Sequence, residues 1–103
     1  MAKLPTQARS YGRTRVFSEA TVPPGLIRAH ATKAGSWGVI HVLEGALAYR
    51  ITDPRRPGSE EALAAGGAPG VIEPTVQHEV APLGAVRFFV EFCRSGPEDA
   101  EAG

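Results

Sequence analysis

The sequence has little of what several protein classes require. It contains a single cysteine, Cys93, so no disulfide can form within the chain, which favours a reducing compartment. Its 11 basic and 11 acidic residues give a formal net charge of zero, and no basic block is present to attract nucleic acid or an anionic membrane. No window approaches the roughly 18 apolar residues of a spanning helix, and the stretch MAKLPTQARS lacks the apolar core of a signal peptide. These absences predict a cytoplasmic protein with no nucleic-acid or membrane partner.

Glycine and proline, in contrast, are abundant. The 12 glycines and 9 prolines leave few windows for a helix longer than about two turns. The segments between these breaks have the alternation or the β-branched and aromatic content of strands. The predicted strands cover residues 15–22, 26–33, 37–45, 46–52, 70–74, 77–83 and 85–93. Short strands at this spacing indicate an all-β sandwich or barrel.

A single domain is expected to span residues 1–103, because the chain is too short for a second core. Its core is predicted to cover residues 4–94, and the small, acidic tail 95–103 is expected to fray. Residues 60–67 have helix-forming composition, but they follow a Pro/Gly loop and end in two glycines. We therefore expect one short strand or one turn of helix there.

The last predicted strand bears on how the core is built. Alternation places Val86, Phe88, Val90 and Phe92 on one face, and Arg87, Phe89, Glu91 and Cys93 on the other. The simplest interpretation buries the first set and exposes Arg87 and Glu91 to water. In a barrel, polar residues can also converge on a ligand or a metal at the mouth, and Glu91 could then point inward.

Several motifs occur in an order that resembles a known family. The segments YGRTRVF, TVPPGL, HATKAGSWG, PTVQH and FFVEF lie within residues 4–94. They are similar to the small cupin-like family of YeaR and of the N-terminal domains of some TehB tellurite-resistance proteins. The resemblance implies a cupin-like antiparallel β-barrel of the double-stranded β-helix or jelly-roll type, and a role connected with tellurite resistance and stress response.

The same resemblance implies a metal centre. It carries over His30, His78 and Glu91, one from each of three strands, as the metal ligands. Two imidazoles and one carboxylate suit a divalent transition metal such as Zn, Fe, Ni or Mn, and they leave positions open for water or a small-molecule ligand. A four-ligand cupin site is not expected, because the first motif has no glutamate after its histidine and PTVQH lacks the usual glycine.

Other polar residues have weaker claims on a site. His41 stands between two apolar residues and outside the family motif, so it is expected to face away from them and to contribute little to metal binding. Arg28, Tyr49 and Arg87 could orient an anionic ligand inside the barrel or form surface pairs. Glu79 is expected to be solvated.

Three function classes remain open. The first is a metal-binding cupin that binds, senses or detoxifies a small molecule or an oxyanion. The second is a small metal-dependent enzyme of the dioxygenase or isomerase type, and the third is a non-catalytic interaction module. No general base or nucleophile stands beside an evident partner, which weakens the enzyme hypothesis.

The apolar face around Phe88 also predicts a homodimer. Four apolar side chains in line on one strand would form an exposed patch of the kind that marks an association site. A second sheet within the same chain could cover that face equally well.

Overall fold

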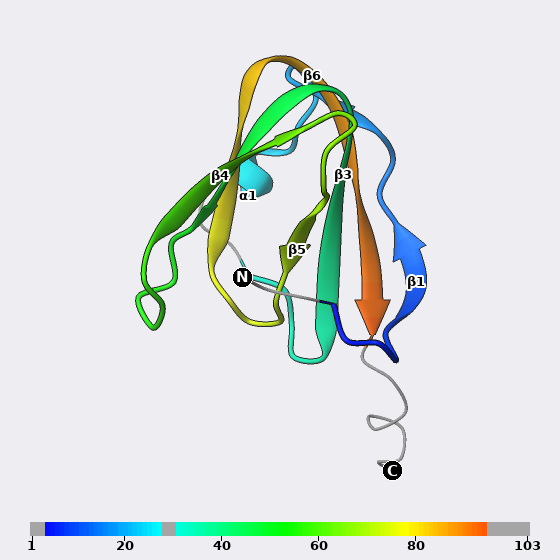
Figure 1. The fold of residues 1–103 in the computed structure, drawn as a ribbon, viewed down its shortest axis with the longest axis vertical. Helices are drawn as coiled ribbons and strands as arrows, with labels where there is room; N and C mark the ends of the chain where they lie inside the picture. The colour runs from blue at the N-terminus through cyan, green and yellow to red at the C-terminus, as the bar shows by residue number, and fades with distance from the viewer. Residues whose placement is uncertain (1–3, 28–30, 95–103) are drawn as a thin grey trace.

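The computed structural model describes residues 4–27 and 31–94. They form one six-stranded antiparallel sheet and one short helix (Figure 1). In chain order the elements are β1 (Arg9–Arg13), β2 (Phe17–Ser18), α1 (Pro24–Ile27), β3 (Ser36–Ile51), β4 (Ser59–Ala64), β5 (Gly70–Ile72) and β6 (His78–Arg94). The strand order is β1-β6-β3-β4, with β2 on β6 and β5 on β3. Within the described residues, no helix has both the length and the apolar character needed to cross a membrane.

Two long, bent strands organise the molecule. β3 and β6 pair along almost their whole length, and both bend at the top of Figure 1, so the sheet folds back on itself as two arms. The first arm consists of β4 with residues 46–51 of β3 and 78–82 of β6. The second arm consists of β1 and β5 with residues 36–42 of β3 and 86–94 of β6.

Glycines form the bend rather than ending the strands. The predicted strands 37–45 and 46–52 are one strand, β3, and 77–83 and 85–93 are one strand, β6. Gly45 has a φ of +76° and Gly84 a φ of +94°, and the β3–β6 register shifts on either side of Gly45. Positive φ and extra residues turn a strand sharply without breaking its pairing. The predicted strand ends were therefore wrong at both glycines.

The N-terminal third differs most from the prediction. Of the predicted strand 15–22, only β2 pairs with another strand. The first two residues of the predicted strand 26–33 belong to α1 instead, and residues 28–30 lie outside the described part of the chain. Proline suits the first turn of a helix, where its missing N–H is not needed, and Pro24 starts α1. β1 was not predicted because all its residues are exposed and carry no alternation.

The sheet is not closed into the barrel that the cupin-like interpretation predicted. β1 and β4 are the two ends of the strand order. β4 and β5 pair with different segments of the same edge of β3, one on each arm, so they face each other without pairing. The all-β prediction is confirmed, whereas closure fails because β4 and β5 are short and separated by the bend.

The core lies between the arms. Phe88 is fully buried, its ring centroid lies 5.7 Å from that of Phe17, and Val86 and Val90 are buried beside it. The predicted burial of this face is thus confirmed, and Phe92 packs against the same cluster. The patch that motivated the homodimer prediction is internal, so a homodimer would need another surface.

Candidate functional site: a groove between the two arms

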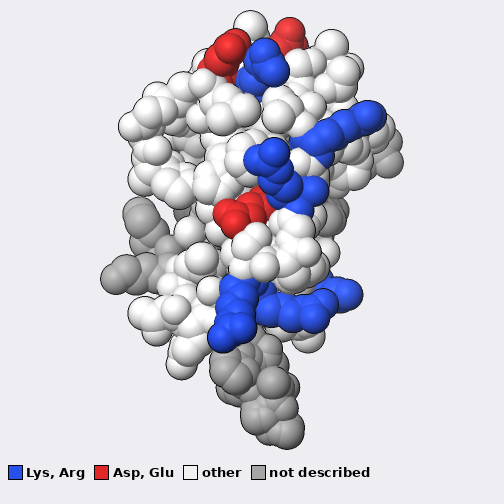
Figure 2. Space-filling model, turned by 90° about the vertical axis from the view of Figure 1, so that its right-hand side faces the viewer, with Lys and Arg blue, Asp and Glu red and all other residues white. Residues whose placement is uncertain are grey.

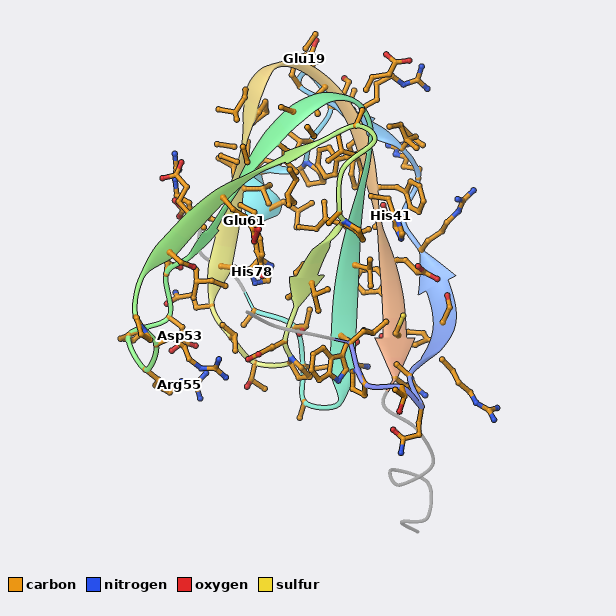
Figure 3. The ribbon with its side chains drawn as sticks, in the orientation of Figure 1. Glu19, His41, Asp53, Arg55, Glu61 and His78 are labelled. Atoms are coloured by element: carbon orange, nitrogen blue, oxygen red, sulfur yellow. The ribbon has the colours of Figure 1, made fainter. Side chains whose placement is uncertain are left out.

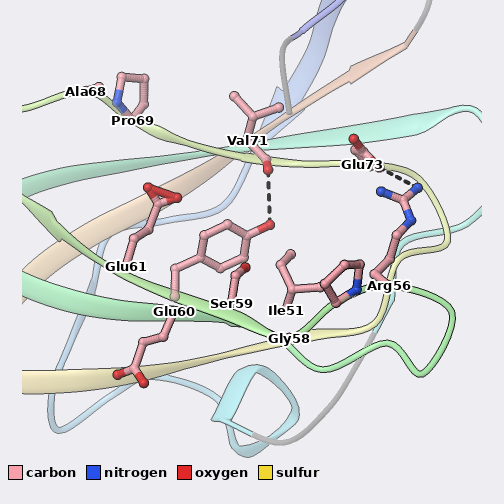
Figure 4. Close-up of a pocket in the computed structure, with 12 residues that line it drawn as sticks. Ile51, Arg56, Gly58, Ser59, Glu60, Glu61, Ala68, Pro69, Val71 and Glu73 are labelled. Carbon is pink, nitrogen blue, oxygen red and sulfur yellow. Dashed lines mark hydrogen bonds and ion pairs between the residues drawn. The ribbon is translucent and has the colours of Figure 1, made fainter. Parts of the chain in front are cut away.

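An open groove of about 670 Å³ lies where β4 and β5 face each other. Figure 4 shows it bounded by the β4 side and by the chain around Val71. It is lined by Tyr49, Ile51, Arg56, Pro57, Gly58, Ser59, Glu60, Glu61, Ala68, Pro69, Val71 and Glu73. Its size and its mixture of apolar walls with a few polar groups are typical of small-molecule sites.

The acidic residues of the groove have different orientations. Glu61 pairs with Tyr49 across β4 and β3 and so shares its inward face, whereas Glu60 pairs with Arg50 on the outward face. Glu60 Oε1 lies 3.4 Å from Arg50 Nε, and Figure 4 shows its carboxylate directed away from that of Glu61. Of these two adjacent glutamates, only Glu61 has its side chain on the face of the sheet that lies between the arms.

Tyr49 connects the two arms at the inner end of the groove. Its hydroxyl donates a 3.0 Å hydrogen bond to the carbonyl oxygen of Val71, which belongs to β5 on the second arm. Burial, followed by the negative charges of Glu61 and Glu73, raises the pKa of Tyr49 to about 12. The phenol therefore stays protonated and acts as a donor.

His78 lies behind Tyr49 on the first arm. It is 1% exposed, and its ring meets the Tyr49 ring edge-on, with centroids 5.9 Å apart. Nδ1 lies 3.0 Å from the carbonyl oxygen of Val76, and because a carbonyl oxygen only accepts, Nδ1–H is the donor. Figure 3 shows His78 and Glu61 in the space between the arms.

A buried aspartate fixes the loop that forms one end of the groove. The Asp53 carboxylate accepts hydrogen bonds from the backbone N–H groups of Arg55 and Gln77 at 2.8 and 2.9 Å, and from the Arg55 guanidinium at 2.6 and 2.9 Å. Arg55 also donates to the carbonyl of Thr75 at 2.6 Å. Arg56 forms an ion pair with Glu73, in which Nη2 lies 2.6 Å from Oε1; a dashed line marks it in Figure 4. These bonds tie the β3–β4 loop to the segment that leads into β6.

We expect an Asp53→Asn variant to unfold at lower urea concentration than wild type at pH 7. The Arg55 guanidinium and the two backbone donors hold the pKa of Asp53 well below its ordinary value of 3.8, and an amide offers only one acceptor oxygen to these donors. A depressed pKa stabilises the folded state above the ordinary value, and this stabilisation is lost as the pH falls through the folded pKa. The difference in urea midpoint between wild type and Asp53→Asn should therefore become smaller below about pH 4. Equal midpoints at pH 7 would contradict this role.

Glu91 and His41 form a pair on the outer face of the second arm. His41 Nε2 lies 2.9 Å from Glu91 Oε1, and the His41 ring stacks on Phe89 with centroids 4.8 Å apart. The hydrogen bond from His41, and a second from Ser10, lower the pKa of Glu91. The prediction that His41 faces the side opposite to Ile40 and Val42 is confirmed, because those two residues belong to the core.

The predicted metal ligands do not all converge. His78 points between the arms, whereas Glu91, at an odd spacing along the same strand, points out of the other arm toward His41. His30 lies outside the described residues. Across residues 4–27 and 31–94, no group of three or more His, Cys, Asp or Glu side chains could hold a metal ion. The structure therefore does not bring Glu91 to His78.

Two of the weaker candidates lie on the surface. Arg87 is exposed, with its guanidinium 3.9 Å from Glu44, and Glu79 pairs with Arg50 at 3.2 Å. Figure 2 shows that several Lys and Arg side chains gather on the face formed by β1 and the second half of β6. This face, which includes Arg9, Arg13 and Arg94, is separate from the groove.

Sequence reasoning missed Asp53, Arg56, Glu61 and Glu73. The run DPRRPGS was recognised only as a loop, although an aspartate before a proline and two arginines is a local signal for a turn held by its own side chain. Glu61 and Glu73 carry no such signal. They meet in the groove only because the sheet folds over.

A folded-over antiparallel sheet with an open, partly apolar groove defines a small all-β domain. Residues 12–90 match the family described as the TehB-like domain, and the chain belongs to this family. The resemblance found in the sequence motifs is thereby confirmed. No curated protein matches the chain.

Solved structures share the fold. TehB from Haemophilus influenzae superposes with a TM-score of 0.81 at 21% identity over 90% of this chain and 33% of that chain, so this chain spans a third of that protein. A protein from E. coli strain K12 gives 0.82 at 21% identity, over 93% of this chain and 99% of that chain. Hydroxypropylphosphonic acid epoxidase from S. wedmorenis gives 0.54 at 23% identity, over 74% and 40%. At these identities the likeness establishes the fold alone.

Proposed function

We propose that this TehB-like domain binds a small molecule in the groove between its arms. The observation that carries the proposal is the groove itself, whose inner end is formed by Tyr49 with the buried His78 behind it. Buried polar side chains beside an open, mostly apolar groove are expected where a ligand needs orientation as well as desolvation. Two hydrogen bonds fix the groove on its two sides: Asp53 accepts one from the backbone N–H of Gln77, and the Tyr49 hydroxyl donates the other to the carbonyl of Val71 on the opposite arm.

A divalent transition metal is a further part of the proposal. The epoxidase that shares the fold has been solved with Fe(II) and with Co(II). In this chain His78 shares one feature with metal-binding histidines, because its Nδ1–H donates to a backbone carbonyl, which fixes the direction of the ring. His30 is the second proposed donor. Glu91 is held by His41 on the outer face and is not included. A metal at this position would supply a Lewis-acid centre next to the groove.

Replacing His78 by alanine should lower the affinity for Zn(II) or Ni(II) by more than about tenfold, because a bound imidazole is lost. The measurement is metal content after dialysis against equimolar metal, together with titration calorimetry. His41→Ala is the matched control, since that histidine lies on the outer face. Its metal content should equal that of wild type.

Two results would count against the metal. Equal metal content in wild type and His78→Ala would remove His78 as a ligand, and a wild-type protein that binds neither metal would remove the metal centre altogether. Because His78 is buried, His78→Gln and a thermal unfolding curve are needed to separate loss of a ligand from loss of the fold. The small-molecule proposal would survive either result.

A further inference from the structure

The charges that face the groove discriminate between classes of ligand, an inference that rests on the proposed function of the groove as a binding site. Among the described residues, three glutamates and one arginine line it. Glu60 is turned outward to Arg50, and Glu73 is neutralised by Arg56, whose Nη2 lies 2.6 Å from Glu73 Oε1. Within residues 4–27 and 31–94, no ion pair involves Glu61. The inward-facing groups therefore carry one carboxylate in excess.

The described residues of the groove offer no unpaired cation to an anion. Among residues 4–27 and 31–94, Arg56 is the only Lys or Arg that lines the groove, and its guanidinium is already bound to Glu73. The Tyr49 hydroxyl is already donating to Val71. In the metal-free protein, an incoming oxyanion would approach Glu61 without an unpaired Lys or Arg among the described lining residues, and like charges in a partly desolvated site repel.

The remaining walls suit the body of an organic molecule. Ile51, Val71, Pro57 and Pro69 supply apolar surface, and Tyr49 supplies an aromatic ring beside Glu61. A carboxylate, an aromatic ring and apolar walls together are the chemistry that recognises an amine. We propose that the groove binds an organic cation, with its ammonium or guanidinium group at Glu61 and its apolar body against Tyr49, Ile51 and Val71.

Three matched probes test this charge selection. Tryptamine, tryptophol and indole-3-acetate share one aromatic body and are cationic, neutral and anionic at pH 7. Calorimetric titration of the full chain, after removal of metal with a chelator, should give the highest affinity for tryptamine and the lowest for indole-3-acetate. A charge-assisted hydrogen bond predicts that tryptamine binds about tenfold more tightly than tryptophol. The difference in affinity between tryptamine and tryptophol should become smaller at high salt, which screens the charge of Glu61.

Glu61→Gln and Glu60→Gln are matched variants on adjacent residues. Glu61→Gln should remove the preference for tryptamine over tryptophol, whereas Glu60→Gln should retain it, because Glu60 faces outward. Both residues are exposed, so both variants are expected to fold, which circular dichroism checks.

The outcomes separate the two proposals. Binding of all three probes with equal affinity, or a preference unchanged in Glu61→Gln, would overturn the organic-cation inference and leave the groove as a binding site. Tighter binding of indole-3-acetate would overturn it as well. Failure of all three probes to bind would count against the groove itself and would overturn both proposals.

Discussion

A Gly45→Ala variant is expected to lose at least about 2 kcal/mol of folding stability, because two costs fall on one residue. Gly45 has a φ of +76°, which L-residues rarely adopt, and a Cβ there would lie 2.0 Å from the carbonyl oxygen of Ala85. That contact is with backbone in the neighbouring strand, so no side-chain rotation relieves it. The bend of β3 over β6 would have to open. Urea denaturation followed by circular dichroism measures the loss.

Gly84→Ala is the matched control. Gly84 also has a positive φ, +94°, but a Cβ there would meet nothing within 4 Å. Gly84→Ala should lose only the folding stability that alanine costs at a positive φ, about 1–2 kcal/mol. Equal losses at the two glycines would show that the close approach of Gly45 to Ala85 does not hold the bend.

A Phe88→Ala variant is expected to lose about 3–5 kcal/mol, the range for truncating a fully buried phenylalanine. Phe88 is 0% exposed and packs on Phe17 in the space between the arms. The adjacent Phe89 is half-buried on the outer face, where it contacts His41 and Arg13. Phe89→Ala should therefore lose markedly less, about 1–2 kcal/mol. Comparable losses would contradict the assignment of the two faces.

The sequence predicted those features that depend on neighbouring residues. Alternation in AVRFFVEFC identified Val86, Phe88 and Val90 as one buried face, and the glycines and prolines excluded long helices. The same glycines were misinterpreted as strand ends. Whether a glycine ends a strand or bends it depends on whether the partner strand continues beside it, and the partner here lies some forty residues away.

The site was harder to predict because it is assembled by long-range packing. Glu91 and His78 were assigned to two different predicted strands, but in the structure they lie on one strand, β6, at an odd spacing that places them on opposite faces. The family resemblance implied that Glu91 and His78 meet at one metal site. In the structure Glu91 instead pairs with His41, fifty positions away in the chain. Glu61 lies beside Tyr49 through the pairing of β3 with β4, whereas Glu73 comes near Tyr49 only after the sheet has folded over, and no local pattern marks either glutamate.

The most direct test of the binding groove is a map of backbone amide chemical shifts during a titration with tryptamine. We expect the largest changes at residues 49, 51, 56, 58–61, 68, 71 and 73, which line the groove and carry a backbone amide proton. Changes confined to the basic outer face, at residues 9–13 and 86–94, with the groove amides unmoved, would contradict it.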